Sequence, residues 1–356
     1  MSDFRSDTVT QPTAAMKQAM MEAPLGDDVF GDDPTVNRLQ EMAAQMLGFE
    51  AALLAPSGTQ TNLIAMMTHC QRGDEAIVGQ QWHTYRWEAG GMAVLGSIQP
   101  QPLEHQPDGT IALEDVEAAI KPDDPHFAKT RLVVMENTTG GKVLPLAYMR
   151  AVRDLATRHS LRTHIDGARL FNAAVAQAEL EGTDPVQQAR AICQGYDSLS
   201  LCLSKGLGAP IGSLLLGSAD FIRQARRVRK MLGGGMRQAG LIAAAGMHAL
   251  QNHVHRMAED HAHARLLSEG LADIAAMHPK LAGKVSVHPA QTNIVFCDIE
   301  GGVADELQQH LAAHGVKVTS GYFRVKERAM KRMRWVTHLN VGRADVEHAL
   351  RAVAAF

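Results

Sequence analysis

Short, nearly continuous runs of apolar residues alternate along this chain with longer stretches that are apolar on one side only. The short runs predict buried strands, one directly before Ser57 and others at 75–80, 92–104, 131–137, 161–169, 199–203 and 212–218. The longer stretches predict helices, which include 34–48, a helix that begins after Ser57, 113–121 and 146–160. Buried strands separated by helices are typical of a mostly parallel sheet covered on both faces, so we expect an α/β fold.

A chain of 356 residues is too long for one simple core, so the sequence predicts more than one domain. We expect an N-terminal arm over 1–30, a large domain that contains the parallel sheet over 31–245, and a smaller α+β domain over 246–356. The region 1–36, which contains an acidic, glycine-containing segment at 26–34, is either a frayed tail or a segment that closes over a site. The stretch 240–271 predicts a single long helix.

Polar residues follow several of the predicted strands at the point where each strand ends. In open parallel sheets, ligands bind at the carboxyl ends of the strands. The pattern places six polar residues there, namely Ser57, His83, Glu136, Asn137, Asp166 and Lys205. We therefore expect one site at this edge of the sheet.

Lys205 follows an apolar strand and precedes Gly206. A lysine held in a dry cleft can attack a carbonyl carbon and form a Schiff base. A lysine at a strand end can equally lay its stem along the surface and keep its head group in water. This stretch alone leaves both interpretations open.

Ser57, Gly58 and Thr59 stand where a predicted strand turns into a helix. Free N–H groups at a helix start form a cradle that suits a phosphate, although the same residue types also cap ordinary helices. His83 has aromatic neighbours in a chain with only 4% aromatic residues, and these neighbours are Trp82, Tyr85 and Trp87. Such a cluster indicates either a floor for a bound ring or a histidine packed in a core.

Charge and cysteine content limit the classes of partner and compartment. The net charge of −3 argues against a nucleic-acid or membrane-surface partner, and no apolar run approaches membrane-spanning length. The chain has 4 cysteines without paired or metal-like spacing, which is typical of a reducing compartment, so we expect a cytoplasmic protein. The histidines of 240–271 do not converge on one helix face, so we expect no metal site there.

Taken together, the residues at the predicted sheet edge are the parts that pyridoxal 5'-phosphate requires. Asp166 would keep the ring nitrogen protonated, His83 would stack on the ring, and Lys205 would bind the aldehyde. The cradle at 57–59 would hold the phosphate. The combination favours this cofactor more strongly than any of its members does alone.

The chain also resembles a known family, the low-specificity L-threonine aldolases of the aspartate-aminotransferase-like group of pyridoxal-phosphate enzymes. The resemblance extends over nearly the whole chain and is carried by FRSDTVTQP, PLGDDVFGDDPTVN, SGTQTNL, VGQQWH, EAGG, LGSIQPQP, ENTTGGKVLP, HIDGARLFNA, CLSKGLGAPIGSLL, RKMLGGGMRQAG and VTHLNV. It implies a large, mostly parallel-sheet domain with a smaller C-terminal α+β domain. It also implies a homotetramer built from dimers, with sites at the dimer interface.

The resemblance implies a role for individual residues as well. Lys205 would carry the cofactor, Asp166 would contact the ring nitrogen, and His83 would stack on the ring and take the β-hydroxyl proton. Phosphate would be bound at Gly58 and Thr59, with Arg237 close to the same group. The amino-acid carboxylate would be held by Ser6, Arg169 and Arg334, of which Arg334 has a near neighbour in Arg332, and His126 would act near the substrate hydroxyl as a base or through a water.

The implied reaction is the cleavage of L-threonine, L-allo-threonine and related β-hydroxy-α-amino acids to glycine and an aldehyde. The segment 315–338 is longer than expected, which favours bulky substrates such as L-phenylserine as an alternative. A β-eliminating or racemising enzyme and a non-catalytic pyridoxal-phosphate-binding protein are further alternatives, and product analysis separates them.

Overall fold

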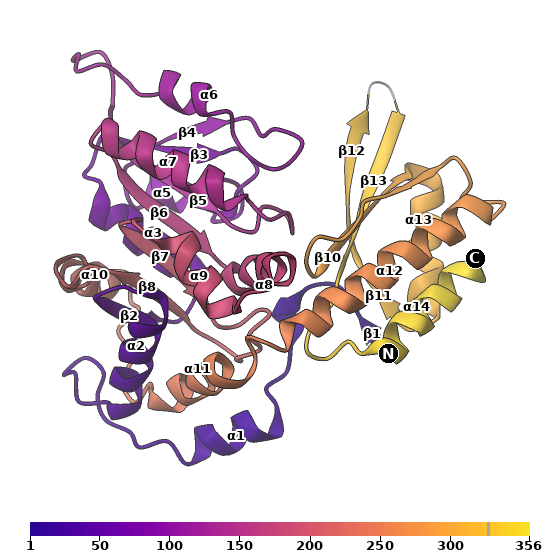
Figure 1. The fold of residues 1–356 in the computed structure, drawn as a ribbon, viewed down its shortest axis with the longest axis horizontal. Coiled ribbons are helices and arrows are strands. Elements are labelled where there is room, and N and C mark those ends of the chain that lie inside the picture. Colours follow the sequence, from indigo (N-terminus) through magenta and orange to yellow (C-terminus); the bar gives the residue numbers. More distant parts are fainter. Residues whose placement is uncertain (326–327) are drawn as a thin grey trace. The chain divides into compact units, whose positions relative to one another are not determined.

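The computed structural model describes residues 1–325 and 328–356, and the chain forms two compact units (Figure 1). The larger unit consists of Pro12–Val254, and the smaller unit combines Met1–Gln11 with His255–Phe356. The first eleven residues thus belong to the same unit as the C-terminal third of the chain.

The core of the larger unit is a mixed sheet, which in the described residues has seven strands in the order β2-β8-β7-β6-β5-β3-β4. Strands β3 to β7 of this sheet run parallel, while β8 is antiparallel to both β7 and β2. The strands are β2 (Ala51–Ala55), β3 (Asp74–Gly79), β4 (Gln99–Leu103), β5 (Lys129–Glu136), β6 (Arg162–Gly167), β7 (Ser198–Cys202) and β8 (Ser213–Gly217). The near-continuous apolar runs are therefore buried strands, as the sequence predicts, and the α/β fold is confirmed.

Helices cover both faces of this sheet. One face is covered mainly by α3 (Gly58–His69) and α10 (Ala219–Met231), and the short α5 (Gly91–Val94) packs beside α3. The other is covered by α2 (Pro34–Leu47), α7 (Leu146–Arg158) and α9 (Pro185–Cys193), with α8 (Leu170–Glu181) packed on α9. The remaining helices of the unit are α1 (Ala14–Met21), α4 (His83–Arg86), α6 (Leu113–Ala118) and α11 (Gly240–Asn252).

Two of the predicted elements are wrong in extent. The strand expected over 92–104 is in fact the helix α5 followed by the shorter strand β4, because Gly96 and Ser97 form a turn between them. The single helix expected over 240–271 is two helices, α11 and α12 (Met257–Met277), because the chain turns at 253–256 where it passes from one unit to the other. Apolar periodicity continues across that turn, so the pattern did not reveal it.

The acidic segment 26–34 has a structural role in the larger unit. Asp33 caps the start of α2 by accepting the N–H groups of Thr35 and Val36, and it also accepts the N–H of Gly240 at 2.8 Å. Asp28 is buried and pairs with Arg229 of α10 at 2.7 Å. These contacts attach the segment to three helices, α2, α10 and α11, so it is not a frayed tail.

The buried pair of Asp28 and Arg229 predicts a large effect on stability. The two side chains are only 1% and 5% exposed, and Arg229 also donates to the carbonyl oxygen of Leu54 at 2.6 Å. Arg229→Ala leaves Asp28 buried without its counter-charge and should lower the free energy of unfolding by about 3–5 kcal/mol. Arg223 on the same helix pairs with Asp220 while both are 71% exposed, so Arg223→Ala should cost less than about 1 kcal/mol. Urea denaturation followed by circular dichroism compares the two, and equal losses would contradict the assignment.

The smaller unit is built around an antiparallel sheet, which in the described residues has four strands in the order β12-β13-β10-β9. Its strands are β9 (Val285–Val287), β10 (Ile294–Glu300), β12 (Thr319–Val325) and β13 (Arg328–Val336), and its helices are α12 (Met257–Met277), α13 (Gly301–Ala313) and α14 (Arg343–Ala354). At the N-terminus, β1 (Ser2–Asp3) pairs with β11 (Val316–Lys317), and η1 (Asp7–Val9) follows. Phe4 is fully buried in this core and packs edge-on against Trp335.

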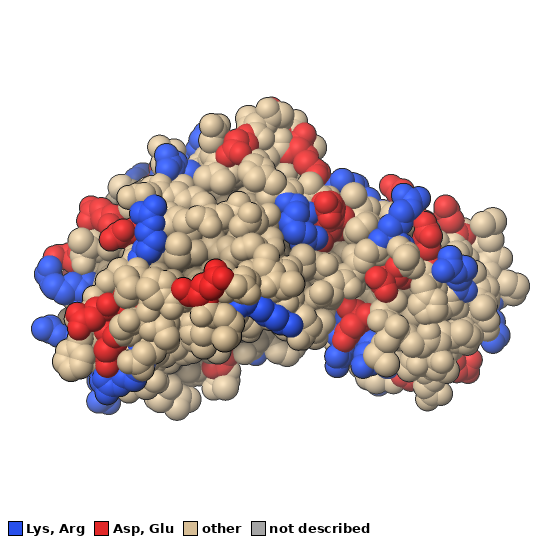
Figure 2. Space-filling view, turned by 90° about the horizontal axis from the view of Figure 1, so that it is seen from below, with Lys and Arg blue, Asp and Glu red and all other residues tan. Residues whose placement is uncertain are grey.

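The surface carries both signs of charge. On the face seen in Figure 2, basic and acidic side chains are interspersed and a wide area of the larger unit is uncharged. Among the described helices, none is both long enough and apolar enough to span a bilayer.

Candidate active site

Five strands that precede candidate residues end at one edge of the sheet of the larger unit. Because β2 and β7 are both antiparallel to β8, they run in the same direction, which is also the direction of β3, β5 and β6. Their carboxyl ends lead into Ser57, His83, Glu136, Asp166 and Lys205. The prediction that these residues come to one edge is confirmed by the strand order.

Asp166 is at the end of β6 and is only 2% exposed. Its Oδ1 accepts the N–H of Ala168 at 3.0 Å, and its Oδ2 accepts from the amide nitrogen of Asn62 at 2.9 Å. The same amide nitrogen donates to Glu88 at 2.9 Å. Asn62 therefore joins two buried carboxylates.

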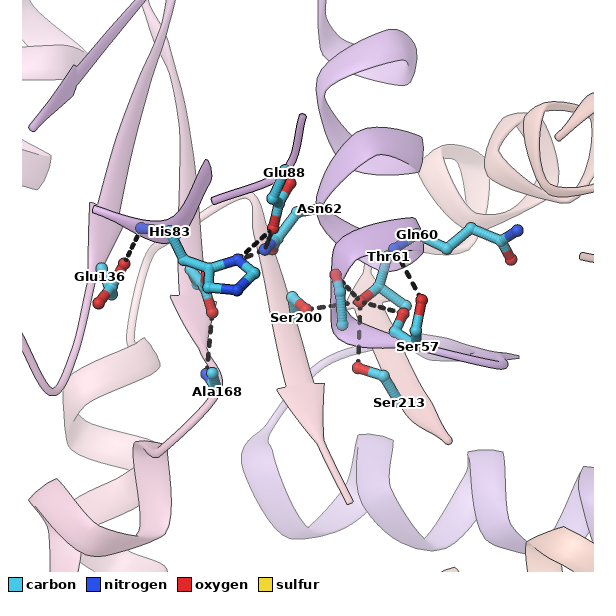
Figure 3. Close-up of polar contacts among 12 residues, drawn as sticks. Ser57, Gln60, Thr61, Asn62, His83, Glu88, Glu136, Ala168, Ser200 and Ser213 are labelled. Carbon is cyan, nitrogen blue, oxygen red and sulfur yellow. Dashed lines mark hydrogen bonds and ion pairs between the residues drawn. The ribbon is translucent and has the colours of Figure 1, made fainter. Parts of the chain in front are cut away.

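His83 is at the start of α4 and faces these carboxylates. Its Nδ1 lies 2.8 Å from Oε1 of Glu88, and its backbone N–H donates to Glu136 at 2.6 Å (Figure 3). One potential ligand atom each of His83, Glu88 and Asp166 lies within 4.8 Å of the others. Hydrogen bonds from His83 and Asn62 already engage the carboxylate oxygens, so hydrogen bonding is sufficient to hold the three groups together.

The charges in the site shift the pKa values of these groups. The hydrogen bond that His83 donates to Glu88 raises the pKa of His83, the charge of Asp166 raises it further, and the charge of Lys205 lowers it. Burial raises the pKa of Glu88. Burial, together with the charge of Asp166, raises the pKa of Glu136 to about 8, so Glu136 is mostly protonated at neutral pH. The charges of Asp166 and Lys205 thus both shift the pKa values of His83 and Glu136.

The start of α3 forms the predicted cradle. Ser57 is the N-cap, and its Oγ accepts the N–H of Gln60 at 3.2 Å. The N–H groups of Gly58 and Thr59 have no acceptor within the helix and are available to an anion. Thr61 fixes this end of α3 to the sheet through hydroxyl contacts of 2.6 Å to Ser200 and 3.0 Å to Ser213 (Figure 3).

Lys205 lies in the turn that follows β7. It is half-buried, and its carbonyl oxygen accepts the N–H of Gly208 at 2.8 Å. Gly208 has a φ of 78°, which a residue with a Cβ adopts only under strain. The glycines after Lys205 therefore close a tight turn that holds the lysine at the end of the strand.

The predicted aromatic floor around His83 is wrong. Trp82 is fully buried, donates to Thr139 at 3.0 Å and packs edge-on against His105. Trp87 is 63% exposed, and Tyr85 is also exposed. Side chains that are adjacent in sequence at a strand-to-helix turn point in different directions. The three aromatic residues near His83 therefore do not form one surface.

The other predicted residues of the larger unit have different surroundings. Arg169 is half-buried at the start of α8, directly after β6. Arg237 forms an ion pair with Asp27 at 3.1 Å and is largely exposed. His126 is exposed in a loop, with its Nδ1 at 2.6 Å from Asp124. The described contacts of Arg237 and His126 do not include the residues around Asp166.

Ser6 and Arg334 both belong to the smaller unit. Ser6 caps η1 by accepting the N–H of Thr8, and Arg334 is half-buried on β13. A backbone hydrogen bond links the two segments that carry these residues: the N–H of Val336 donates to the carbonyl oxygen of Phe4 at 2.9 Å. Arg332, the alternative to Arg334, is held by two hydrogen bonds to Asp298.

Sequence reasoning missed Asn62 and Glu88. Asn62 is a buried polar residue of α3 that directly precedes the apolar run at 63–67, which is a signal for a partner inside the protein. Glu88 follows His83 by five residues, just after α4, and the turn there brings its carboxylate back to the ring.

The family model described as beta-eliminating lyase matches residues 3–301 of the chain, and this match defines the class of the protein as a lyase. Curated relatives identify the family within this class of lyases. The chain is 47% identical over its full length to a low specificity L-threonine aldolase of Escherichia coli O157:H7, of which it covers 99%. It is 42% identical to low-specificity L-threonine aldolase 1 of Arabidopsis thaliana, over 98% of this chain and 94% of the relative. The chain belongs to the low-specificity L-threonine aldolase family.

Solved structures with lower sequence identity share the fold. A threonine aldolase from Leishmania major superposes with a TM-score of 0.83 at 20% identity, over 100% of this chain and 99% of the other. A serine palmitoyltransferase from Sphingomonas wittichii superposes with a TM-score of 0.74 at 20% identity, over 99% of this chain and 86% of the other. These likenesses extend the α/β assignment to the whole chain.

Proposed function

We propose that this enzyme uses pyridoxal 5'-phosphate to cleave L-threonine, L-allo-threonine and related β-hydroxy-α-amino acids into glycine and an aldehyde. One observation carries the proposal: an acid, a histidine, a lysine and a helix start lie at the same edge of the sheet. The membership in the threonine aldolase family supports the same reaction.

The residues at this edge fit the cofactor. The buried carboxylate of Asp166 suits a protonated ring nitrogen, and the open N–H groups at Gly58 and Thr59 suit a phosphate. The amine of Lys205 suits an aldehyde, with which it would form a Schiff base. When bound, pyridoxal phosphate supplies a ring that accepts the electrons left on the amino-acid Cα after a bond there breaks.

Protein groups would hold each part of the cofactor. Asp166 keeps its charge directed at the ring nitrogen because Ala168 and Asn62 fix both of its oxygens. Ser57 supports the phosphate cradle as the N-cap of α3, and Arg237 is assigned to the same phosphate. For Arg237 this assignment requires the ion pair with Asp27 to open, or a neighbouring subunit to present the arginine.

The substrate carboxylate is assigned to Arg169, with Ser6 and Arg334 as further contributors. A guanidinium group forms paired hydrogen bonds with a carboxylate and thereby fixes its orientation. Arg334 is preferred to Arg332 because Asp298 engages the Arg332 guanidinium through both Nε and Nη2. Fixing the carboxylate is what would set the direction of the Cα–Cβ bond that breaks.

His83 is the preferred group for the β-hydroxyl proton. Glu88 engages Nδ1, which leaves Nε2 to exchange a proton with the substrate. The raised pKa of His83 keeps its ring protonated to a higher pH than an isolated histidine, so loss of that proton would define the acid limb of activity. His126 is the second candidate, with a role in holding a water.

Assembly and location are also proposals. Exposed apolar side chains occur on and near α1 and α11, and they include Met21, Leu25, Phe30 and Leu241. A hollow of about 350 Å³ lies between α1, α2 and α11, and the surface seen from this side has a wide uncharged area (Figure 2). These features support a homo-oligomer, which we assign as a tetramer of two dimers in the cytoplasm.

A β-eliminating lyase is the second candidate, favoured by the description of the matching family model. Product analysis with L-threonine, L-allo-threonine and L-phenylserine separates the candidates. Glycine and an aldehyde in equal amounts, dependent on pyridoxal phosphate, are expected for the aldolase, and the three rates show whether bulky substrates are preferred. A keto acid and ammonia without glycine would overturn the proposal in favour of elimination.

A further inference from the structure

A row of polar side chains leads away from Asp166 through the interior of the larger unit. Asn62 is bonded to His164 of β6 at 3.1 Å, His164 to Ser198 of β7 at 2.8 Å, and Ser198 to His69 at 2.7 Å. Asn62, His164 and Ser198 are at most 1% exposed. The row lies between α3, which contributes both ends, and the sheet, which contributes the middle.

The chemistry of these groups fixes the direction of every hydrogen bond. Both amide hydrogens of Asn62 go to the carboxylates of Glu88 and Asp166, so its oxygen accepts, and Nε2 of His164 must carry the proton. Burial lowers the pKa of His164 to about 3, so its ring is neutral and Nδ1 is an acceptor. The hydroxyl group of Ser198 therefore donates to His164.

The same reasoning gives the direction of the hydrogen bond between Ser198 and His69, at the other end of the row. The oxygen of Ser198 accepts from His69, so Nε2 of His69 carries the proton. Burial lowers the pKa of His69 to about 4, so this ring is neutral as well, and it stacks on Phe221 with ring centroids 4.4 Å apart. All the bonds of the row thus donate in one direction, from His69 to the two carboxylates.

We propose that His69, Ser198, His164 and Asn62 form a one-way donor row that holds Asp166 and Glu88 as ionised, fixed carboxylates at the edge of the sheet where the cofactor would bind. These four are positioning residues, because they act through Asp166 and Glu88. The inference rests on the proposed function, in which Asp166 faces the ring nitrogen. Donor bonds that point the same way polarise one another, so each makes the next a better donor.

The row offsets two effects that disfavour the ionised forms of Asp166 and Glu88. Asn62 bonds to both of these buried carboxylates, so their negative charges repel each other, and burial favours their protonated forms. Donors directed at the carboxylates offset both effects. The row begins at the opposite edge of the sheet, where His69 lines a hollow of about 960 Å³ with Arg162 and Asp197, so it spans the sheet from one strand end to the other.

Two buried serines provide a matched pair of variants. Ser198→Ala removes the hydroxyl that joins the two histidines. Ser268→Ala removes a buried hydroxyl on α12 of the smaller unit, where it donates to the carbonyl oxygen of Arg265 at 3.0 Å. Loss of one hydrogen bond in the row should lower kcat for L-threonine by about threefold to tenfold with little change in KM. Ser268→Ala should leave both constants near those of the wild-type enzyme.

A spectroscopic measurement tests whether the row affects protonation of the cofactor ring nitrogen. In enzyme loaded with ¹⁵N-labelled pyridoxal phosphate, Ser198→Ala should shift the ring-nitrogen resonance towards its unprotonated position, and Ser268→Ala should not. Identical resonances in the two variants would overturn the inference. If the proposed function were wrong, wild-type protein would instead fail to turn over any of the three substrates.

Histidine tautomers give a test that needs neither a variant nor turnover. In wild-type protein, with and without cofactor, ¹⁵N spectra of the imidazole rings should show His69 and His164 as neutral Nε2–H forms from pH 6 to 8. A protonated Nδ1 on His164 would reverse the direction of the row and overturn the inference, even if Ser198→Ala fails to fold.

Discussion

Lys205→Ala enzyme is expected to lose at least about 10³-fold in turnover of L-threonine, because alanine has no amine to bind the cofactor aldehyde. It should also lack the visible absorbance band of lysine-bound pyridoxal phosphate. The fold should persist, since Lys205 is half-buried in a turn whose closure depends on the backbone of Gly208. Stopped assays of glycine formation and absorbance spectra at saturating cofactor measure both effects.

The matched control for this variant is Lys129→Ala, which removes an exposed lysine at the start of β5 on the same sheet. It should show the wild-type spectrum and rate. A Lys205→Ala protein that retained the absorbance band and turned over threonine would refute the role of Lys205 and the proposed function with it.

Asp166→Asn is expected to lower kcat by at least about 10²-fold, because a neutral amide cannot stabilise a protonated ring nitrogen as a carboxylate does. The substitution keeps the size of the side chain, and its amide oxygen can still accept from Ala168 or Asn62. Asp166→Glu keeps the charge but displaces it, so we expect intermediate activity.

The same variant has a pH signature. Asp166 raises the pKa of His83, so removal of its charge should lower that pKa. The ring of His83 then loses its proton at a lower pH, and any rate limb that depends on this proton moves to lower pH. Titration of His83 by NMR in Asp166→Asn and wild-type protein checks the sign. An upward shift, or unchanged kcat, would exclude Asp166 as the partner of the ring nitrogen.

The main parts of the site could be predicted because they depend on one property of parallel sheets. Strand ends can be located from apolar runs, and parallel strands bring their carboxyl ends to the same edge. The strands that end before Ser57, His83, Asp166 and Lys205 therefore identify the edge. None of those positions requires knowledge of a side-chain direction.

The aromatic cluster and the supporting network depend on side-chain directions, and these could not be predicted. Whether Trp82 points into the core or towards a ligand is decided by the turn at α4. Likewise, His164 reads as one more residue of a buried strand until its partner Ser198 is placed on the neighbouring strand. A long-range pair of this kind leaves no periodic signal in the sequence.

The acidic segment shows a different limit. Its charges and glycines are equally typical of a frayed tail and of helix capping, and only the burial of Asp28 and Asp33 separates the two. The partners that bury them, Arg229 and Gly240, lie about 200 residues further along the chain, a separation at which local patterns carry no information.

The pairing of β1 with β11 has a consequence for the synthesis of this protein on the ribosome. Residues 1–11 leave the ribosome before residues 12–254, yet Ser2 pairs with Val316 and Phe4 packs against Trp335. At about 5–20 residues per second, this N-terminal segment waits roughly 15–60 s for its partners, while residues 12–254 can already collapse around their own sheet. The N-terminal segment, in which Phe4 is the main apolar side chain, therefore stays without its strand partner for most of elongation.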